Sequence, residues 1–432
     1  MHLSKTQTFV ITALNVVIIA LVAIIFWTPL GSFSAAGGDG DGDSPTGGNV
    51  KEHVKLRTAS AGKTPDILRE TRLMGNGDET VVAVYFRGGV SYIFGNATVK
   101  GLDFDSYGGF LCLVNSAGTI LSFTYFDGAI GAVGIISGGF AVGAGEKLYF
   151  VDNAGASEFK ADTEGAVLDI QSVVTSPKIA VVTQPTGQSI RLCEYTVSEE
   201  EWAAGNATRI HSIRDLEYFG CYDFGESRYV VSARASSAPR YEALAFFSFT
   251  AGGEPTAYYE GGSVENITRP YAVVPYGEVF MSLVSRDGNA AVITLDESGA
   301  DYRAKSLGFT ADGARLFFVG NKYYACFERG AGAISYEIKD GLGYDRLDDW
   351  DGITVDRVLS LQTLTAVGHR DENTAVISPL SGKTTALDIE NCVFYGGFEN
   401  IDGYTFVLSA TGGKALSSPT AERDIYIITV RN

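Results

Sequence analysis

Short runs of β-branched and aromatic residues follow one another along most of this sequence. From about Thr80 onward, these runs are separated by Gly, Asn, Asp and Ser. Val, Ile, Tyr and Phe favour strands, and the intervening residue types supply tight turns. Representative runs are TVVAVYF (80–86), KIAVVTQ (178–184) and IYIITV (425–430). The pattern predicts an all-β domain over residues 80–432. The only candidates for short helices lie near residues 64–73, before this domain, and near residues 198–205, within it.

The strand runs recur in similar modules, roughly every 40 to 50 residues. Each module places an apolar strand before a turn of Asn, Asp, Ser and Gly, and a more polar strand follows. Examples are GGFLCLVNSAGTILSFTYFDG (108–128), GEKLYFVDNAGASEFKADTEG (145–165) and EVFMSLVSRDGNAAVITLDESG (278–299). The turn residues tolerate the positive φ angles of tight hairpins. A repeated unit of this size indicates an architecture built from stacked or ringed modules.

This repetition resembles the β-propeller superfamily, in the manner of tryptophan-aspartate-type or quinoprotein-type repeats, over about residues 75–432. The resemblance implies seven or eight four-stranded blades, with the run at residues 425–430 closing the ring against an N-terminal strand. Two β-sandwiches in tandem are the alternative arrangement. The chain has three Trp and does not repeat a Trp-Asp dipeptide or a tryptophan docking motif from module to module. No ligand or catalytic residue is therefore carried over from either family.

An uncharged apolar run, FVITALNVVIIALVAIIFW, extends from Phe9 to Trp27. As a helix it spans roughly 28 Å, close to the hydrocarbon thickness of a bilayer. Lys5 precedes the run and the next basic residue is Lys51, so the positive-inside rule places the N-terminus in the cytoplasm. The sequence predicts a single-pass signal anchor at residues 9–28 in the plasma membrane. The alternative is a cleaved signal peptide, and both interpretations export the remainder of the chain.

The remaining boundaries follow from composition. Residues 1–8 form the predicted cytoplasmic N-terminus, residues 29–52 a flexible Gly/Asp/Ser linker, and residues 53–79 a connecting segment before the ectodomain at 80–432. Asp39, Asp41 and Asp43 alternate in the linker, but Ser44 and Val50 stand where a calcium-binding EF-hand loop requires Gly and Glu. The linker is therefore not predicted to bind calcium.

Charge and cysteine content exclude some classes of partner. The formal net charge of −18 opposes binding to nucleic acid. The five cysteines stand singly, without metal-ligand spacing, and most are set among apolar residues, so we expect them to be core residues. They are Cys112, Cys193, Cys221, Cys326 and Cys392. No cofactor motif is present, and no metal site is predicted. Sequons at Asn96, Asn206 and Asn266 would be glycosylated only in a host with that machinery.

One acidic cluster is the candidate binding site. The segment YDRLDDWDG contains Asp345, Asp348, Asp349, Trp350 and Asp351, which could bind a polar ligand or a cation. The alternative interpretation is a solvated loop between blades.

Other residue types give weaker signals. His211 and His369 lie in turn-like settings and are expected to be ordinary surface histidines, and no Gly-x-Ser-x-Gly elbow is present. The pairs Tyr258–Tyr259 and Tyr323–Tyr324 place one ring on each face of a strand. One ring of each pair could then reach solvent or a neighbouring blade.

These observations favour a non-enzymatic binding or scaffold module, displayed on the outer side of a bacterial plasma membrane, for a protein or a cell-wall polymer. An extracytoplasmic glycan-active enzyme using paired carboxylates in the propeller channel is the alternative function. The sequence does not predict an oligomeric state.

Overall fold

The computed structural model describes strands and turns in the second of two units of the chain, residues 51–432. The described residues are 57–60, 67–74, 78–99, 106–172, 177–185, 190–198, 202–209, 216–223, 228–235, 242–248, 256–259, 267–276, 279–295, 302–319, 322–329, 332–350, 353–361, 363–371, 374–380, 384–387, 389, 392–400, 403–410 and 424–430. The expected anchor at 9–28 and linker at 29–52 lie outside them. Within these residues, no helix is long and apolar enough to cross a bilayer.

The described strands form antiparallel sheets, seven with four strands and one with five. Each four-stranded sheet is a meander of consecutive strands, and each sheet is named here after its first strand. The first three sheets contain β3 (Thr80–Arg87), β4 (Val90–Val99), β5 (Ser106–Asn115) and β6 (Ile120–Phe126); β7 (Ile130–Ile136), β8 (Gly139–Ala144), β9 (Lys147–Asp152) and β10 (Ser157–Asp162); β11 (Ala166–Ser172), β12 (Lys178–Gln184), β13 (Arg191–Val197) and β14 (Trp202–Arg209).

The next four sheets contain β15 (Leu216–Asp223), β16 (Arg228–Ala235), β17 (Glu242–Ser248) and β18 (Thr256–Tyr259); β19 (Ile267–Tyr276), β20 (Val279–Arg286), β21 (Asn289–Leu295) and β22 (Tyr302–Ser306); β23 (Gly313–Val319), β24 (Lys322–Arg329), β25 (Gly332–Ile338) and β26 (Tyr344–Asp349); β27 (Thr354–Ser360), β28 (Leu364–Asp371), β29 (Thr374–Pro379) and β30 (Thr385–Leu387). A short 3-10 helix, η1 (Asp340–Leu342), precedes β26.

The five-stranded sheet joins the two ends of the described chain. Its order is β1 (Arg57–Ser60), β2 (Ile67–Met74), β33 (Asp424–Val430), β32 (Gly403–Ala410) and β31 (Cys392–Asn400). Ile425 pairs with Leu73, and Val430 pairs with Ile67. The prediction that the run at residues 425–430 pairs with an N-terminal strand is confirmed. This is the sheet named after β31 below.

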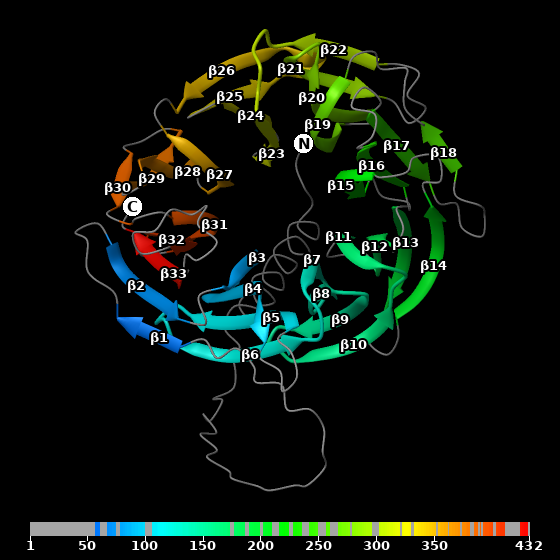
Figure 1. Cartoon of the computed structure of the whole chain (residues 1–432). Coiled ribbons are helices and arrows are strands. Elements are labelled where there is room, and N and C mark those ends of the chain that lie inside the picture. The colour runs from blue at the N-terminus through cyan, green and yellow to red at the C-terminus, as the bar shows by residue number, and fades with distance from the viewer. Residues whose placement is uncertain are drawn as a thin grey trace, which may run out of the picture. The chain divides into compact units, whose positions relative to one another are not determined.

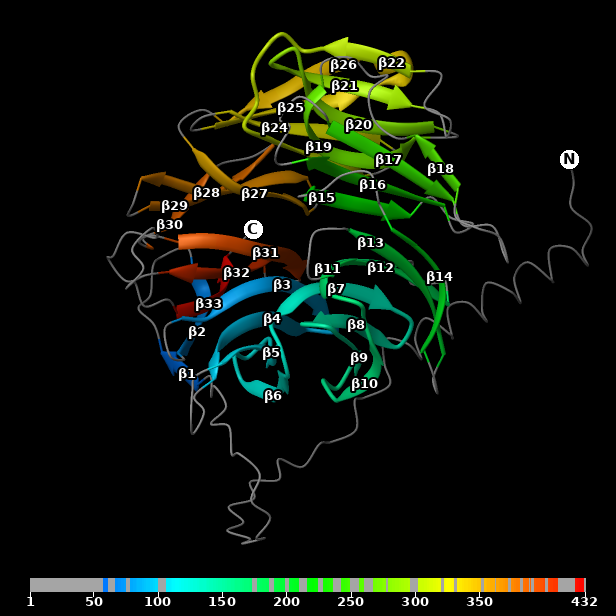
Figure 2. The same cartoon turned by 45° about the vertical axis from the view of Figure 1, so that its right-hand side comes forward.

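The first strand of each sheet contacts the first strand of the next, and β31 contacts β3, so the succession is closed. Figures 1 and 2 show these first strands nearest the centre of the ring and the fourth strands at its outside. Cyclic contact among eight first strands within the described residues is the arrangement of a propeller and not of two sandwiches.

Apolar side chains fill the layers between neighbouring sheets. One layer joins Phe94 and Phe140 of the β3 and β7 sheets, and another joins Phe394 of the β31 sheet to Val367 of the β27 sheet. Middle strands are covered on both faces: all six residues of β8 are buried. This explains why the sequence shows continuous apolar runs at such strands and not a strict alternation.

Glycines in the run GAIGAVGIISGGFAVGAG allow close packing of backbones. A Cβ at Gly131 on β7 would lie 1.9 Å from the carbonyl oxygen of Val167 on β11, and one at Gly139 would lie 2.0 Å from the carbonyl oxygen of Val151. Only a residue without a side chain fits at these two positions. These glycines serve packing within and between sheets, and the run forms strands.

Three expectations need correction or refinement. The two short helices expected near residues 64–73 and 198–205 are wrong, because the chain there forms β2 and β14. β2 pairs with β1 on one side and β33 on the other. This pairing with distant strands overrides the local helix propensity of the segment. The segment 53–79, which sequence analysis treats as a connection, contains β1 and β2 of the closing sheet.

Asn96 is the third case. Its side chain is buried, donating from Nδ2 to the Ile130 carbonyl at 3.0 Å and accepting at Oδ1 from the Ile130 N–H at 2.6 Å. Both amide atoms therefore join the β3 and β7 sheets, and the sequon at Asn96 is not an accessible glycosylation site in the folded protein.

Candidate functional site

The described residues include part of the acidic cluster singled out in the sequence. Asp345, Asp348 and Asp349 lie on β26, the fourth strand of its sheet, and Asp351 lies outside the described residues. The Asp345 carboxylate is exposed and pairs with Lys339. Trp350 is 3% exposed. A ligand site at these residues stays a prediction, but the Trp350 ring does not stand on the surface beside the Asp345 carboxylate.

Trp350 packs in the apolar layer between the β23 and β27 sheets, with Val358, Leu364 and Ala366. The tyrosine pair at 323–324 has a similar structural role. Tyr323 packs against the layer towards the β19 sheet, and Tyr324 packs against the layer towards the β27 sheet. Both rings thus contact neighbouring sheets, one of the two outcomes expected for this pair.

A different set of polar residues comes together across two successive sheets. We name it the Asp356 cluster: Arg315, Glu328, Asp356, Arg357 and His369. Arg315 is on the inner strand β23, and Asp356 and Arg357 are on the inner strand β27. Glu328 and His369 are on the adjacent strands β24 and β28. Nothing in the sequence places these residues together, because they belong to four strands.

Asp356 is at the centre of the cluster. Its Oδ2 accepts a hydrogen bond from the backbone N–H of Phe394 on β31 at 3.1 Å, and its Oδ1 lies 3.7 Å from Nδ1 of His369. The side chain is 12% exposed. Burial disfavours the charged carboxylate and raises the pKa of Asp356 to about 6, despite the opposing effects of the Phe394 N–H, His369 and the two arginines.

The two arginines join neighbouring inner strands. Nη2 of Arg315 donates to Oε1 of Glu328 at 3.1 Å and to the carbonyl oxygen of Asp356 at 3.0 Å. Nε of Arg357 donates to the carbonyl oxygen of Phe394 at 3.1 Å. Burial, and then the nearby Arg315 guanidinium, lowers the pKa of Arg357. Arg315 has a carboxylate partner, whereas Arg357 forms no ion pair with any residue in the described part of the chain.

His369 differs from the expectation of a surface histidine in a turn. It lies on β28, opposite Thr354 and Ala375, with 29% of its side chain exposed. Nδ1 is buried and has no hydrogen-bond partner, since 3.7 Å to Asp356 is too long for a hydrogen bond. His211 and His53 lie outside the described residues.

A β-bulge explains how Asp356 and Arg357 are both directed into the cluster. The register between β27 and β28 shifts between Val355 and Arg357, so Asp356 is the extra residue. Bulges redirect side chains and are common beside functional sites. Other inner strands carry a bulge too, but there the extra residue is uncharged, as with Val82 on β3, Gly131 on β7 and Leu168 on β11.

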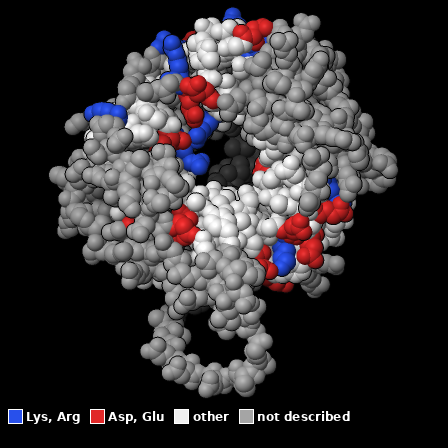
Figure 3. All heavy atoms as spheres, viewed as in Figure 1, with Lys and Arg blue, Asp and Glu red and all other residues white. Residues whose placement is uncertain are grey.

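The cluster lies towards the middle of the ring. Figure 3 shows that this face is hollowed at its centre, with basic atoms at the rim of the hollow on the side of β23 and β27.

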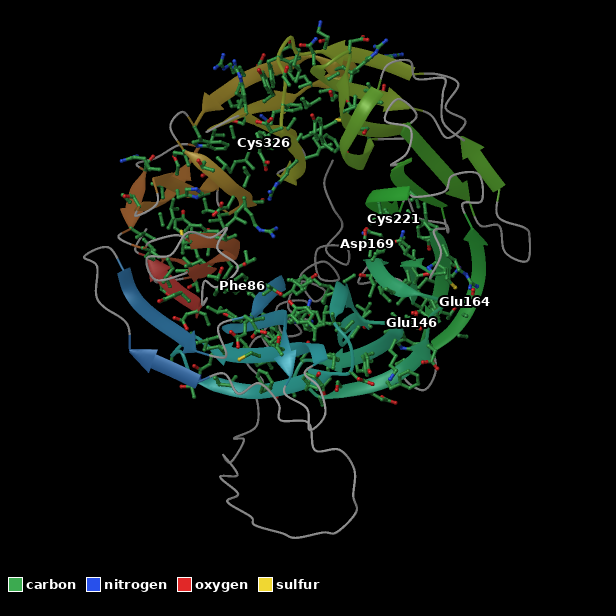
Figure 4. The ribbon with its side chains drawn as sticks, in the orientation of Figure 1. Phe86, Glu146, Glu164, Asp169, Cys221 and Cys326 are labelled. Carbon is green, nitrogen blue, oxygen red and sulfur yellow. The ribbon has the colours of Figure 1, made fainter. Side chains whose placement is uncertain are left out.

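Two other buried acids are already satisfied by protein groups. Asp169 on β11 accepts hydrogen bonds from the Tyr218 hydroxyl and from Nε2 of Gln171, and burial raises its pKa. Figure 4 shows Asp169 on the inner side of its sheet. Glu194 pairs with Lys178 at 2.8 Å and accepts from the Tyr229 hydroxyl at 2.7 Å. These two acids connect strands and are fully engaged, unlike the Asp356 cluster.

The cysteines do not supply a nucleophile. All five are buried and free, which confirms the expectation that they are core residues. Burial raises the pKa of Cys112, Cys326 and Cys392 to about 12, so their thiols stay protonated and unreactive. Among the described residues, no three His, Cys, Asp or Glu side chains form a group that could hold a metal ion.

The fold defines the class of this protein: its described residues form a β-propeller architecture, closed by pairing between the strands β2 and β33. Its structure is similar to the β-propeller domain of the Trilobed protease from Pyrococcus furiosus, at 10% identity and a TM-score of 0.42, covering 81% of this chain and 95% of that domain. The AfRom2 CNH domain is similar at 8% identity and a TM-score of 0.40, covering 83% and 98% of the two chains.

Acylaminoacyl peptidase from Pyrococcus horikoshii is a further similar structure, at 12% identity and a TM-score of 0.46. The match covers 77% of this chain and 58% of the peptidase, so the chain spans a little over half of that protein. No model of a protein family matches the sequence, and no curated protein matches it. These similarities concern the fold alone.

Proposed function

We propose that this chain is a membrane-anchored, extracytoplasmic β-propeller that acts as a non-enzymatic binding or scaffold module for a protein or a cell-envelope polymer. Each sheet corresponds to one blade, which gives an eight-bladed ring. The observation that carries the proposal is the Asp356 cluster, where Arg357, a half-buried arginine without an ion-pair partner among the described residues, lies on the inner strand β27.

The chemistry of the cluster suits binding. Arginine side chains stay protonated and offer hydrogen-bond donors in a fixed geometry, but they serve poorly as acids, bases or nucleophiles. The cluster is assembled from strands of two neighbouring sheets and hydrogen-bonds to the backbone of a third, and sites on strands of a scaffold are held more rigidly than sites on loops. A rigid set of donors around a central hollow selects a ligand without needing to transform it.

The membrane anchor in this proposal rests on the apolar run from Phe9 to Trp27 and on the basic residue Lys5 before it. The anchor would hold residues 1–8 in the cytoplasm and the ring outside the cell. A short Gly-rich linker would then allow the ring to reach partners near the membrane surface.

One observation favours the second candidate function, a glycan-active enzyme. Asp356 has a pKa raised to about 6, and the Glu328 carboxylate binds the same Arg315 guanidinium whose Nη2 contacts the Asp356 backbone. Two carboxyl groups in unlike environments are the requirement for acid–base hydrolysis of a glycosidic bond. Glycan hydrolysis that is lost in Asp356→Asn would favour this function over binding alone.

The experiment that tests the leading proposal is crosslinking of the full-length protein in its own cells, followed by affinity capture and mass spectrometry. A chain truncated after residue 56 serves as the control, because it keeps the predicted anchor and linker but lacks every described strand. A partner captured by the full chain and absent from the control supports a binding ring. Equal capture by both chains, or capture of nothing, contradicts the proposal.

A second variant locates the contact. Replacement of residues 9–28 by an unrelated transmembrane helix should leave the captured partner unchanged if the ring makes the contact. Loss of the partner would instead assign the contact to the predicted transmembrane helix.

A further inference from the structure

The donors of Arg357 are only partly used. A guanidinium has five N–H groups, and the contact from Nε to the Phe394 carbonyl at 3.1 Å uses one of them. No carboxylate in the described part of the chain forms an ion pair with Arg357. The remaining donors on the two terminal nitrogens are therefore suited to a group that comes from outside the chain.

The surroundings make Arg357 a costly residue to leave unpaired. It is half-buried on an inner strand, next to the second guanidinium of Arg315, whose charge opposes its own. Arg315 is neutralised by Glu328 at 3.1 Å, whereas the nearest acid to Arg357 along the chain, Asp356, is directed at the Phe394 N–H and His369. An anion bound between the two arginines would offset both the cost of burying the Arg357 charge and the repulsion between the two guanidinium groups.

The geometry of the donors restricts the anion. A planar guanidinium matches a carboxylate or a phosphate through two parallel hydrogen bonds, and such charge-assisted pairs are stronger than neutral hydrogen bonds. The net charge of −18 on the chain repels an anionic ligand at long range. Affinity must then come from short-range contacts inside the hollow, which favours an isolated oxyanion over an extended polyanion.

We infer that Arg357, positioned beside Arg315, anchors an oxyanion of the ligand, either a carboxylate or a phosphate group. This inference deepens the proposed function, since it names the chemistry recognised at the same site. Arg315 contributes through its charge and by holding the β27 backbone at Asp356. Arg357 makes the direct contact with the anion.

The test is titration of the full chain in detergent micelles with sodium acetate and with sodium phosphate at constant ionic strength, followed by ¹³C and ³¹P NMR line broadening. Arg357→Gln should weaken binding of the recognised anion by about tenfold or more, as expected for loss of one charge-assisted hydrogen-bonded pair. Arg357→Lys keeps the charge without the planar fork and should fall between Arg357→Gln and the wild type.

Arg303→Gln is the matched control, because Arg303 is an exposed arginine on the outer strand β22. It should change binding by less than about twofold. Tighter binding of phosphate than of acetate would identify a phosphate-bearing ligand, and the reverse would identify a carboxylate. If neither anion binds the wild type, or if Arg357→Gln binds like the wild type, the inference is wrong. If circular dichroism shows that Arg357→Gln does not fold, Arg357→Lys and Arg315→Gln replace it. Weaker anion binding than in the wild type then supports the inference, and unchanged binding in both variants contradicts it.

Capture of partners from cells by the Arg357→Gln chain separates this inference from the proposed function. Loss of anion binding together with loss of the captured partner supports both. If Arg357→Gln loses anion binding but still captures the partner, the oxyanion site is supported and the partner binds another surface. Ring-dependent capture without any anion binding keeps the binding module and rejects the oxyanion chemistry.

Discussion

Asp356→Asn is expected to stabilise the protein at neutral and alkaline pH. In the folded state burial raises the pKa of Asp356 from 3.8 to about 6, so the folded chain holds the proton more tightly than the unfolded chain does. The free energy of unfolding must then fall as pH rises through this interval, because the unfolded chain loses the proton first. Asparagine resembles the protonated acid, and its Oδ1 can still accept the hydrogen bond that the Phe394 N–H donates.

The magnitude follows from the pKa difference. About two units at about 1.4 kcal/mol each give at most about 3 kcal/mol of destabilisation in the wild type above about pH 6. Because the side chain is only 12% exposed, solvent screening reduces this value little. We therefore expect Asp356→Asn to gain about 1 to 3 kcal/mol at about pH 8 and little at about pH 4.

The assay is urea unfolding of the full chain at both pH values, with linear extrapolation to water. Asp345→Asn is the control, because Asp345 is an exposed acid paired with Lys339, and exposed pairs of this kind contribute about 0 to 1 kcal/mol. A stabilisation that is the same at both pH values, or a loss of stability at about pH 8, would refute the reasoning. A stabilisation independent of pH would mean that folding does not shift the pKa of Asp356, and a loss of stability would mean that the ionised carboxylate makes a net favourable interaction in the folded state.

Three further outcomes are expected. Asn96→Ala should cost about 2 to 4 kcal/mol in urea unfolding, because it leaves the N–H and carbonyl of Ile130 without the partners they have at 2.6 and 3.0 Å; a smaller cost would mean that water replaces the amide. The five cysteines should react with a thiol reagent only after guanidinium is added, and rapid labelling of the native chain would contradict their burial. Gly131→Ala should cost more than about 2 kcal/mol, since its Cβ would meet the Val167 carbonyl oxygen at 1.9 Å, whereas Ile135→Ala, at a 37% exposed residue of the same strand, should have a small effect.

The strand pattern could be predicted from sequence because it depends on local periodicity and turn residues. Runs such as TVVAVYF and KIAVVTQ coincide with β3 and β12, and closure of the ring through residues 425–430 was predictable from the need to pair an edge strand. The two expected helices failed for the opposite reason. Ile67–Met74 is a strand because β33 pairs with it from the far end of the chain, and no local signal carries that information.

The candidate site could not be found in the same way. Asp356 and Arg357 stand in TVDRVLS, an ordinary strand sequence, and their partners Arg315 and His369 come from other strands. The available signal was modest: two adjacent charged residues inside a run that becomes an inner strand. Asp345, Asp348 and Asp349 were more conspicuous because they lie within five consecutive residues of the sequence.

The pairing of β2 with β33 also governs how the protein can be made. Apart from β1, every other described strand lies between these two in the chain, so β2 has no partner on one side until β33 has been synthesised. Over that interval the nascent chain carries an exposed hydrogen-bonding edge, which is a template for pairing with other chains. A cut or stop shortly before Asp424 would consequently give an arc with an unpaired strand at each end, prone to aggregation, and not a smaller ring.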